Sequence, residues 1–451
     1  MCSTSIESLP DDVLRVIFLF FIDHYSLLAH ALSNSTTTLR LVSQLWDAIV
    51  RCTPRLWTHL QMVFGEPAVP VPPPTVLSQW TTFSAEVPLT IDMDLSKGRD
   101  SEETRFIQYL DILSSAIHRW RSLRLHLSSE SSASLASAFD RFEISRAKAL
   151  TFTNITLRCG KSEKMDTIIT NLARAPSLRH LRWAPCNSFI ANAMTHHFPL
   201  NRLRSLYVGF YILPATIEVL RQCTSADHIT LYFAHPGVEQ VVPANTESIY
   251  LHNLRVFELV VMELDSPFLT LLHAPRLSVL CINFTDFQGH GSPPPNSTLP
   301  AKLKELLIRN RSLQVLILNS IPYTEITAIF RAPELQALRV LEIIYPDPNQ
   351  FGGLQKVLVA EDEKNKDAVG TDPKSPPQEA KPRKPPSAPD SRKRKVICRP
   401  LLDGAIVLGW TDPKWDEEFF YIPESPSVRM CGRTMEWWRI VSKYEDREKA
   451  T

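Results

Sequence analysis

Apolar residues near the start of the chain recur at the three- and four-residue spacing of one helix face. Pro10, Asp11 and Asp12 precede them and suit a helix start, because proline is tolerated in the first turn and acids favour the positive end of the helix dipole. The stripe consists of Val13, Leu14, Ile17, Phe18 and Phe21, and it is widened by Leu19, Phe20 and Ile22. This pattern predicts a helix that is buried on more than one side.

Further apolar stretches follow within the first 60 residues. Residues 33–38 are polar and predict a break, and the apolar positions in residues 39–50 predict a second helix. Pro54 marks its end, because the residue before a proline is biased away from helix. A third short apolar set comprises Leu56, Trp57 and Leu60. Residues 6–60 are therefore predicted to form a small helical bundle, which the proline-rich residues 65–75 separate from the rest.

From about residue 106 to residue 345 the chain repeats the apolar pattern L-x-x-L-x-L. The clear copies begin 22 to 36 residues apart, at Leu178, Leu203, Ala226, Leu254, Leu277, Leu313 and Leu335. Weaker copies begin at Trp120 and Ala147, and the dipeptide Ala-Pro precedes three of the clear copies by the same offset. A recurring phase of this kind predicts one strand for each copy.

Helical patterns lie between the copies, at residues 165–174, 216–221 and 324–330. A strand plus a helix at a period of roughly 20–29 residues is the signature of leucine-rich repeats. One such repeat cannot bury its apolar face alone, so neighbouring repeats must stack to complete the core. The chain is therefore predicted to be an α/β protein, with a helical bundle followed by an irregular solenoid of strand–helix units. One loop is predicted to be inserted between residues 277 and 313.

The C-terminal part changes character twice. Residues 361–395 lack apolar anchors, are rich in proline and are predicted to be disordered. They end in a basic run that is either a nuclear localisation signal or a solvated charged linker. Residues 396–447 regain aromatic and aliphatic residues and are predicted to cap the last repeats, since the ends of a solenoid need covering. The basic run consists of Arg392, Lys393, Arg394 and Lys395.

Composition narrows the class of protein. The 451 residues carry a net charge of +1, which does not favour a nucleic-acid surface over the whole molecule. The eight cysteines are scattered without a C-x-x-C pair, which favours free thiols in a reducing compartment. The apolar run from Val16 to Ile22 is much shorter than the roughly 20 residues of a membrane span. We therefore expect a soluble protein of the cytoplasm, the nucleus or both, with no membrane partner.

Candidate chemistry is sparse in this sequence. It lacks the phosphate-binding patterns G-x-x-x-x-G-K-[ST] and G-x-G-x-x-G and the nucleophile pattern G-x-S-x-G. His196 and His197 are adjacent, but no cysteine or carboxylate cluster joins them at the spacing of a zinc site. We expect no cofactor, no metal and no catalytic activity.

Residues 6–60 carry three motifs in order, and together they resemble the F-box. The opening motif is Leu9-Pro10-x-x-x-Leu14-x-x-Ile17-Phe18, the central motif is Val42-Ser43-x-x-Trp46, and the closing motif is Pro54-Arg55-Leu56-Trp57. Many fungal proteins combine such a box with degenerate leucine-rich repeats, and the whole chain is similar to that class. The stretch between the first two motifs is longer than the family's, and the repeats lack the family's usual Asn or Cys after the strand.

The resemblance implies a partner and a surface. In the family the box packs on a Skp-type adaptor, which binds a cullin that carries the RING subunit. Carried over to this chain, the adaptor face would comprise Leu9, Pro10, Leu14, Ile17 and Phe18, with Val42, Trp46 and Trp57 shaping or contacting it. The alternative is that these residues form the core of the bundle. Adaptor binding is favoured because three short helices cannot hide this many large apolar groups among themselves.

The repeats would then select a protein target. Their leucines are expected to form the core, and the residues between them are expected to point away from it along each strand. The candidate target-binding residues are Arg182, Tyr207, Thr230 and Glu258, with Cys281 and Ile317 at equivalent positions. They include no arginine cluster of the kind that reads phosphorylated motifs. The sequence therefore indicates a protein-binding surface without naming its ligand.

These observations lead to one functional hypothesis and one alternative. The chain is expected to be the substrate-recognition subunit of a Skp–cullin–RING ubiquitin ligase, without catalytic residues of its own. The alternative is a scaffold that binds the adaptor or another partner without directing ubiquitin transfer. The predicted modules are the box at residues 1–62, a proline-rich linker at 63–105, the repeats at 106–358, a disordered insert at 359–395 and a capping segment at 396–451.

Overall fold

A computed structural model of the chain shows two compact units, Met1–Leu254 and Arg255–Thr451. Each unit builds a mostly parallel sheet in which helices and strands alternate, so the predicted α/β class is confirmed. The structure describes residues 6, 9–25, 32–65, 71–95, 100–157, 164–186, 188–210, 213–233, 246–261, 268–284, 299–319, 338, 340–345, 395–400 and 406–408.

The first unit begins with short helices that pack on one another. They are α1 (Asp11–Tyr25), α2 (Leu32–Arg40), α3 (Gln44–Arg51) and the 3-10 helix η2 (Pro54–Trp57). The carbonyl of Pro10 accepts hydrogen bonds from the N–H groups of Val13 and Leu14, at 3.0 and 3.1 Å, and so starts α1 where predicted. Ser43 caps α3, because its hydroxyl accepts a hydrogen bond from the Trp46 N–H at 3.3 Å.

The break between α2 and α3 does not lie where the polar sequence predicts it. The polar residues 33–38 belong to α2, and the chain turns at Leu41 and Val42 instead. The reason is the Ser43 cap, which starts a new helix in mid-pattern. The single helix predicted over residues 39–50 is therefore wrong, and two helices meet within it.

A parallel sheet follows the helices in the first unit. Each strand pairs with the next one along the chain, from β1 to β7, and all of these pairings are parallel. The strands are β1 (His59–Val63), β2 (Leu89–Asp94), β3 (Trp120–Leu127), β4 (Phe152–Leu157), β5 (His180–Cys186), β6 (Ser205–Phe210) and β7 (His228–Phe233), with the short β8 (Ile249–Tyr250) after them.

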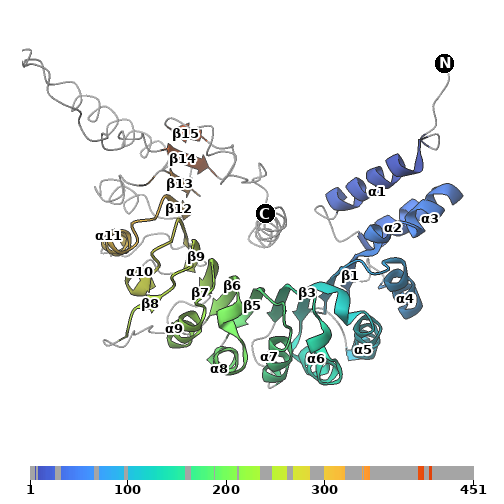
Figure 1. Cartoon of the computed structure of the whole chain (residues 1–451), viewed down its shortest axis with the longest axis horizontal. Coiled ribbons are helices and arrows are strands. Elements are labelled where there is room, and N and C mark those ends of the chain that lie inside the picture. Colours follow the sequence, from blue (N-terminus) through green and yellow to red (C-terminus); the bar gives the residue numbers. More distant parts are fainter. Residues whose placement is uncertain are drawn as a thin grey trace, which may run out of the picture. The chain divides into compact units, whose positions relative to one another are not determined.

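One helix precedes each of the strands from β2 to β7, and Figure 1 shows these helices along one face of the sheet. They are α4 (Pro74–Phe83), α5 (Asp100–Ser114), α6 (Ser129–Arg141), α7 (Met165–Ala173), α8 (Ser188–His197) and α9 (Leu213–Gln222), with the 3-10 turns η3 (Ile117–Arg119), η4 (Ile144–Arg146) and η5 (Leu200–Arg202). The helices predicted at residues 165–174 and 216–221 are confirmed as α7 and part of α9. The core lies between helices and sheet, where Leu123, Leu125 and Trp183 are fully buried.

Strand–helix pairs begin earlier in the chain than the sequence indicates. Residues 63–105, predicted as a linker, contain α4, β2 and the start of α5. The alternation in β2 explains its burial, since Leu89, Ile91 and Met93 face the core and the residues between them are half-buried. The Arg119 guanidinium, just before β3, donates hydrogen bonds to the carbonyls of Val87 and Thr81 and to the hydroxyl of Ser84. These bonds hold the end of α4 close to the sheet.

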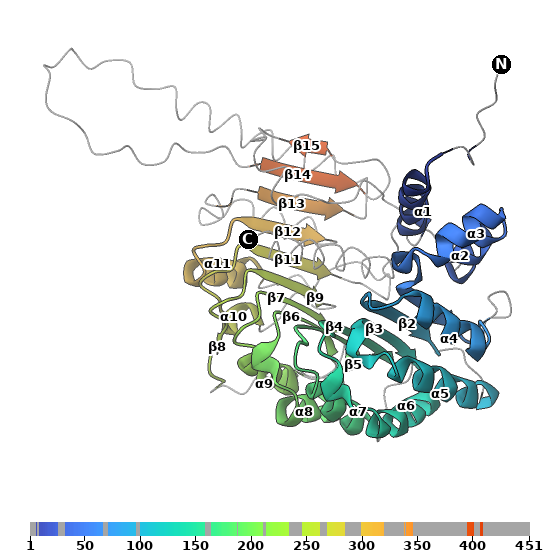
Figure 2. The ribbon, with the colours of Figure 1, turned by 45° about the vertical axis from the view of Figure 1, so that its right-hand side comes forward.

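The second unit continues the same pattern. Its strands are β9 (Val256–Val261), β11 (Val279–Phe284), β12 (Val315–Asn319), β13 (Val340–Tyr345), β14 (Lys395–Pro400) and β15 (Ile406–Leu408), with α10 (Phe268–Leu271), the short β10 (Leu272–His273) and α11 (Leu299–Arg309) among them. The parallel pairings join β9 to β11, β11 to β12, β12 to β13 and β13 to β14, and β15 runs antiparallel to β14 (Figure 2).

Most copies of the apolar pattern mark a strand in the predicted phase. The copies beginning at Trp120, Leu178, Leu203 and Leu277 correspond to β3, β5, β6 and β11, and those beginning at Ala226, Leu254 and Leu313 correspond to β7, β9 and β12. The copies predicted at Ala147 and Leu335 are out of phase by three residues, because Thr153 of β4 pairs with Leu123 and Leu341 of β13 pairs with Leu316. Two parts of the predicted capping segment are seen as β14 and β15. The helix predicted at residues 324–330, the insert at residues 361–394 and residues 409–447 lie outside the described residues.

Candidate functional site

The eight residues predicted for the adaptor face divide into two groups. Leu14, Phe18, Trp46 and Trp57 are buried within the first unit, so their side chains form its core and not an open surface. Leu9, Pro10, Ile17 and Val42 are exposed. The sequence predicts all eight residues for the adaptor face but does not distinguish the buried residues from the exposed ones.

The buried group holds the N-terminal helices together. The rings of Phe18 on α1 and Trp46 on α3 lie 4.6 Å apart, centroid to centroid. The Trp57 indole N–H donates to the carbonyl of Val50 at 2.9 Å. Trp57 also packs against Phe83 and Trp80 of α4, at 5.0 and 6.2 Å between ring centroids. Trp57 therefore joins these helices to the first strand–helix pair of the sheet.

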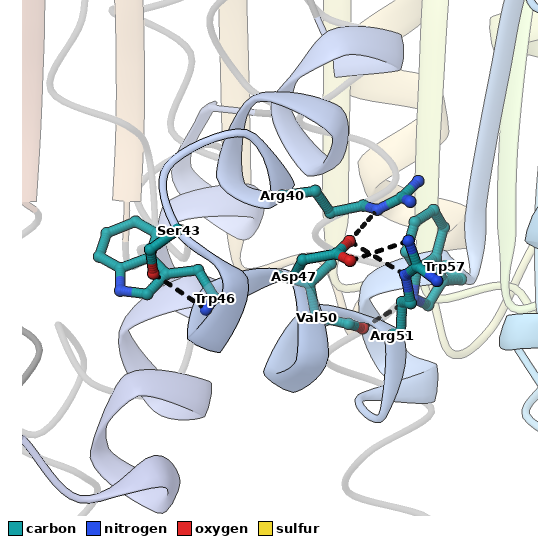
Figure 3. A network of polar contacts seen from close by, with 7 residues as sticks. All are labelled: Arg40, Ser43, Trp46, Asp47, Val50, Arg51 and Trp57. Atoms are coloured by element: carbon teal, nitrogen blue, oxygen red, sulfur yellow. Dashed lines mark hydrogen bonds and ion pairs between the residues drawn. The ribbon is translucent and has the colours of Figure 1, made fainter.

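A charged network braces α2 against α3 (Figure 3). The Asp47 carboxylate accepts hydrogen bonds from Arg40 at 2.6 Å and from Arg51 at 3.0 Å. Arg40 and Arg51 lower the pKa of Asp47 below its usual range, with the hydrogen bond from Arg40 as the largest cause. Arg40 also lies over the Trp57 ring, 5.8 Å from its centroid. The network holds the turn at residues 41–43 in place.

Helix α1 carries a second apolar face that points away from the bundle core. Val13, Val16, Ile17 and Phe20 follow the i, i+3, i+4, i+7 spacing of one helix face, and we refer to them as the outer α1 stripe. Their exposed fractions are 43%, 65%, 38% and 61%. The turn between α2 and α3 adds exposed Leu41 and Val42, and Leu45 on α3 is exposed as well. Contiguous exposed apolar groups mark interaction sites.

The second candidate surface is the sheet face of the first unit that lies opposite the helices. Because side chains alternate across a strand, one residue of each strand contributes to a row that runs across this face. In direct register, this middle row consists of Gln61, Asp92, Arg124, Asn154, Arg182, Tyr207 and Thr230. Three predicted target-binding residues, Arg182, Tyr207 and Thr230, are therefore neighbours on adjacent strands.

The middle row combines charge with aromatic contact. The Arg182 guanidinium lies over the Tyr207 ring at 3.9 Å from the ring centroid. Arg124 lies over Phe152 at 5.8 Å, and its guanidinium is 3.7 Å from the carboxylate of Asp92. Burial lowers the pKa of Arg124 from its ordinary value, and the charge of Asp92 opposes this change. Arg182 and Tyr207 are half-buried. Thr230 lies on the predicted face, in register with Tyr207, but its side chain is buried.

A row of histidine and serine runs beside the middle row. His180 Nδ1 and Ser205 Oγ are hydrogen-bonded, 2.7 Å apart, on neighbouring strands. His228 lies in register with Ser205, and burial together with the charge of His180 lowers its pKa to about 4. All three side chains are buried, so the contacts align the strands of the sheet.

The remaining candidates lie in the second unit. Glu258, Cys281 and Ile317 are in direct register on β9, β11 and β12. The amide of Asn283 donates a hydrogen bond to the Glu258 carboxylate at 2.7 Å. These residues form a row of the same kind as the middle row of the first unit, but with a carboxylate in place of guanidinium groups.

Among the described residues no group of histidine, cysteine and carboxylate side chains is arranged to hold a metal ion. His196 and His197 lie exposed at the end of α8, with ring centroids 6.4 Å apart. None of the helices in the described ranges combines the length and apolar composition needed to cross a bilayer. Cys223 is a buried thiol, whereas Cys52 is exposed.

Comparison with known proteins gives no family for this chain. No family model matches it, and no curated protein matches it significantly. What the chain does therefore has to follow from the outer α1 stripe and from the polar face of the sheet.

Proposed function

We propose that the chain is the substrate-recognition subunit of a Skp–cullin–RING ubiquitin ligase. In this proposal residues 6–60 are an F-box that docks on a Skp-type adaptor, and the strand–helix pairs are leucine-rich-repeat-like units that bind a protein target. The observation that carries the proposal is the outer α1 stripe, on a helix whose opposite face is already buried against Trp46.

The energetics of the stripe support a partner. Covering one large aliphatic or aromatic side chain stabilises a complex by about 1.5–3 kcal/mol. Val13, Val16, Ile17 and Phe20 together therefore offer several kcal/mol that the isolated bundle does not use. Interfaces are commonly centred on large apolar anchors of this kind, surrounded by polar groups. The charged network around Asp47 holds α2 and α3 together, and a pre-organised bundle loses less entropy on docking.

The polar face of the sheet suits the second half of the role. Its charged and aromatic side chains sit on rigid strands, which is the placement that protein recognition requires. A receptor of this type works by proximity: it raises the effective concentration of the target's lysines near the ubiquitin-conjugating enzyme. No residue of this chain takes part in bond chemistry in this proposal.

The proposal also covers where the chain acts. The basic run Arg392, Lys393, Arg394 and Lys395 serves as a nuclear localisation signal in this proposal, so the receptor would work in the nucleus as well as the cytoplasm. Lys395 opens β14, and the other three residues lie outside the described residues. Replacing Arg392, Lys393 and Arg394 with glutamine in a fluorescently tagged chain should lower the nuclear fraction, and an unchanged fraction would remove this part of the proposal.

Docking is tested by co-expression of the full chain with a Skp-type adaptor. The variant Ile17→Asp/Phe20→Asp places two charges in the outer α1 stripe, and we expect it to lose co-purification. Ile308→Asp is the matched control, because Ile308 is an exposed apolar residue on α11. Leu14→Asp is unsuitable, since Leu14 is fully buried and its charge would unfold the helices.

The outcomes separate the receptor from the scaffold. If the double variant co-purifies as well as the parent, the docking surface is wrong. If docking is lost and a bound target accumulates in cells that carry the double variant, the receptor role is supported. Lost docking with unchanged levels of every bound protein would identify the chain as a scaffold that does not direct ubiquitin transfer.

A further inference from the structure

The sheet of the second unit carries a row of valines on the face opposite its main core. Val256 on β9, Val279 on β11 and Val315 on β12 are in direct register, and we refer to these three residues as the valine row. Val340 of β13 occupies the next register position. Leu280 follows Val279, so it faces the other side of the sheet, where it is fully buried.

The valine row belongs to a second, smaller apolar cluster. Val315 is 3% exposed, and Val279 and Ile317 pack against it. Val256 and Val279 are only half-buried. Apolar side chains grouped on one face gain free energy when a further apolar layer covers them.

The strand–helix pattern by itself does not require valines at these positions. In the first unit, the row at the same position in the repeats includes His180, Ser205 and His228, in direct register. The sheet therefore forms equally well with polar side chains there. The valine row is a local feature of the second unit, and it indicates that this face has an apolar partner.

The chain leaves β15 at the end of the sheet where the valine row lies. β15 runs antiparallel to β14, and its last residue, Leu408, pairs with Val396. Val396 is adjacent to Lys395, which pairs with Val340. The chain after Leu408 therefore begins level with the valine row.

The distance along the row is short for the chain that follows. Five strand spacings separate β15 from β9, or roughly 24 Å at about 4.8 Å for each spacing (Figure 2). Residues 409–421 can span up to roughly 43 Å when fully extended, at about 3.3 Å per residue. This stretch is therefore long enough to reach every member of the row directly from β15.

Residues 410–421 have the composition of a segment that needs burial. Five of these twelve residues are aromatic, whereas aromatic residues make up 9% of the whole chain. Aromatic side chains bury large areas and dominate the stability of cores and interfaces. A segment that covered only the edge strand β15 would not contact the valine row. The aromatic residues are Trp410, Trp415, Phe419, Phe420 and Tyr421.

We propose that residues 410–421 dock on the valine row of their own chain. Their aromatic side chains cover Val256 and Val279 and complete the small cluster around Val315. Glu258 lies in the adjacent row, two residues beyond Val256, so the docked segment also restricts access to it. Only this last consequence rests on the proposed function, because it leaves the polar face of the first unit as the surface for a target.

Photo-crosslinking in the full chain tests the docking. With p-benzoylphenylalanine in place of Trp415, we expect cross-links to peptides that contain Val256, Val279 or Val315. The same group in place of Trp437, outside the docked segment, is the matched control and should not give these cross-links. A mixture of light and heavy isotope-labelled chains separates contacts within one chain from contacts with a second copy. Cross-links to other peptides, cross-links only between chains, or none at all would overturn the proposal.

Cys281 provides a second measurement, because its half-buried thiol lies two residues beyond Val279 on the same face of β11. The variant Trp415→Ser/Phe419→Ser removes two aromatic groups from the cover. Iodoacetamide should then label Cys281 roughly tenfold faster or more, as expected when large apolar groups no longer hold the face closed. An unchanged rate would contradict the proposal.

Two controls accompany the labelling. Trp437→Ser/Trp438→Ser makes the same kind of exchange outside residues 410–421 and should leave the labelling rate of Cys281 unchanged; faster labelling in this variant alone would overturn the choice of segment. The buried Cys223 thiol should stay unlabelled in every variant, which separates opening of this face from unfolding. Neither measurement needs the adaptor or a target, so its failure is read separately from failure of the ligase proposal.

Discussion

The indole N–H of Trp57 donates to the backbone carbonyl of Val50 at 2.9 Å, across the turn from α3 into η2. This hydrogen bond links η2 to α3. The rings of Phe83 and Trp80, both on α4, pack against the same indole. One residue therefore couples the helices that carry the outer α1 stripe to the sheet that carries the polar face.

Replacing Trp57 with alanine should lower the free energy of unfolding by about 3–5 kcal/mol, because a large buried aromatic group is lost. Trp57→Phe should cost less, about 1–3 kcal/mol, since it keeps most of the ring packing and removes only one hydrogen bond to the Val50 carbonyl, which still accepts from the Thr53 N–H at 3.2 Å. Denaturant unfolding followed by circular dichroism measures both. Val16→Ala, at an exposed position of α1, is the control and should change stability by less than about 0.5 kcal/mol.

The buried His228 should make the folded protein less stable in mild acid. Burial and the charge of His180 lower its pKa to about 4, whereas an unfolded histidine titrates near 6.5. The unfolded chain therefore binds a proton in this range that the folded chain does not bind. The contribution of neutral His228 to the free energy of unfolding is complete above pH 6.5. It falls as the pH drops from 6.5 to 4, and it does not return below pH 4.

The difference of 2.5 pKa units corresponds to about 3 kcal/mol at most. His228→Gln keeps a polar side chain beside Ser205 and Thr230 without this titration. Thermal unfolding of the parent and the variant between pH 7 and pH 4 should show the flatter curve for the variant. Parallel curves would contradict the assignment.

Substitution of Asn310 should destabilise the second unit. Its fully buried amide accepts a hydrogen bond from the N–H of Ala274 at 2.6 Å and donates to the carbonyl of Leu306 at 2.8 Å. Asn310→Ala should lower the free energy of unfolding by about 1–3 kcal/mol, because both groups then lose a partner. Ile308→Ser, on the exposed side of α11, is the matched control, and equal effects of the two changes on thermal unfolding would count against this role.

Two cysteines should differ sharply in reactivity. Burial raises the pKa of the Cys223 thiol to about 12, and its Sγ contacts the carbonyl of Val219 at 3.2 Å. The thiolate is the reactive form, so native Cys223 should resist iodoacetamide at pH 8 while exposed Cys52 reacts. Mass spectrometry of labelled peptides measures this. Equal labelling of both residues in the native protein would show that the α9–β7 connection opens readily.

Much of the strand–helix alternation was predictable because it depends on local periodicity. The copies of L-x-x-L-x-L located β3, β5 and β6, and the helical spacing between copies located α7. The pair α4 and β2 was missed for a physical reason. Prolines at positions 72 to 74 looked like a linker, but Pro74 occupies the first turn of α4, where its missing N–H is not needed.

The candidate site was only partly predictable. Periodicity identifies Leu14, Ile17 and Phe18 as apolar, but α1 has two apolar faces, and only packing against Trp46 shows that Ile17 lies outside. The outward position of Arg182 and Tyr207 follows from strand alternation. The contact between Arg182 and Tyr207 depends on strand register. Register cannot be deduced from the sequence before it is known which strands pair.

Pairing of each strand with its immediate successor bears on how the first unit acquires its structure. Leu181 pairs with Leu206, and Leu206 pairs with Ile229, so paired residues are 25 and 23 positions apart. Short loops close quickly and with little entropy loss, so each pair can form as soon as its second strand has left the ribosome. Folding of the sheet can then nucleate at several strand pairs. Addition of successive strands to any of these pairs gives the same register between Arg182 and Tyr207.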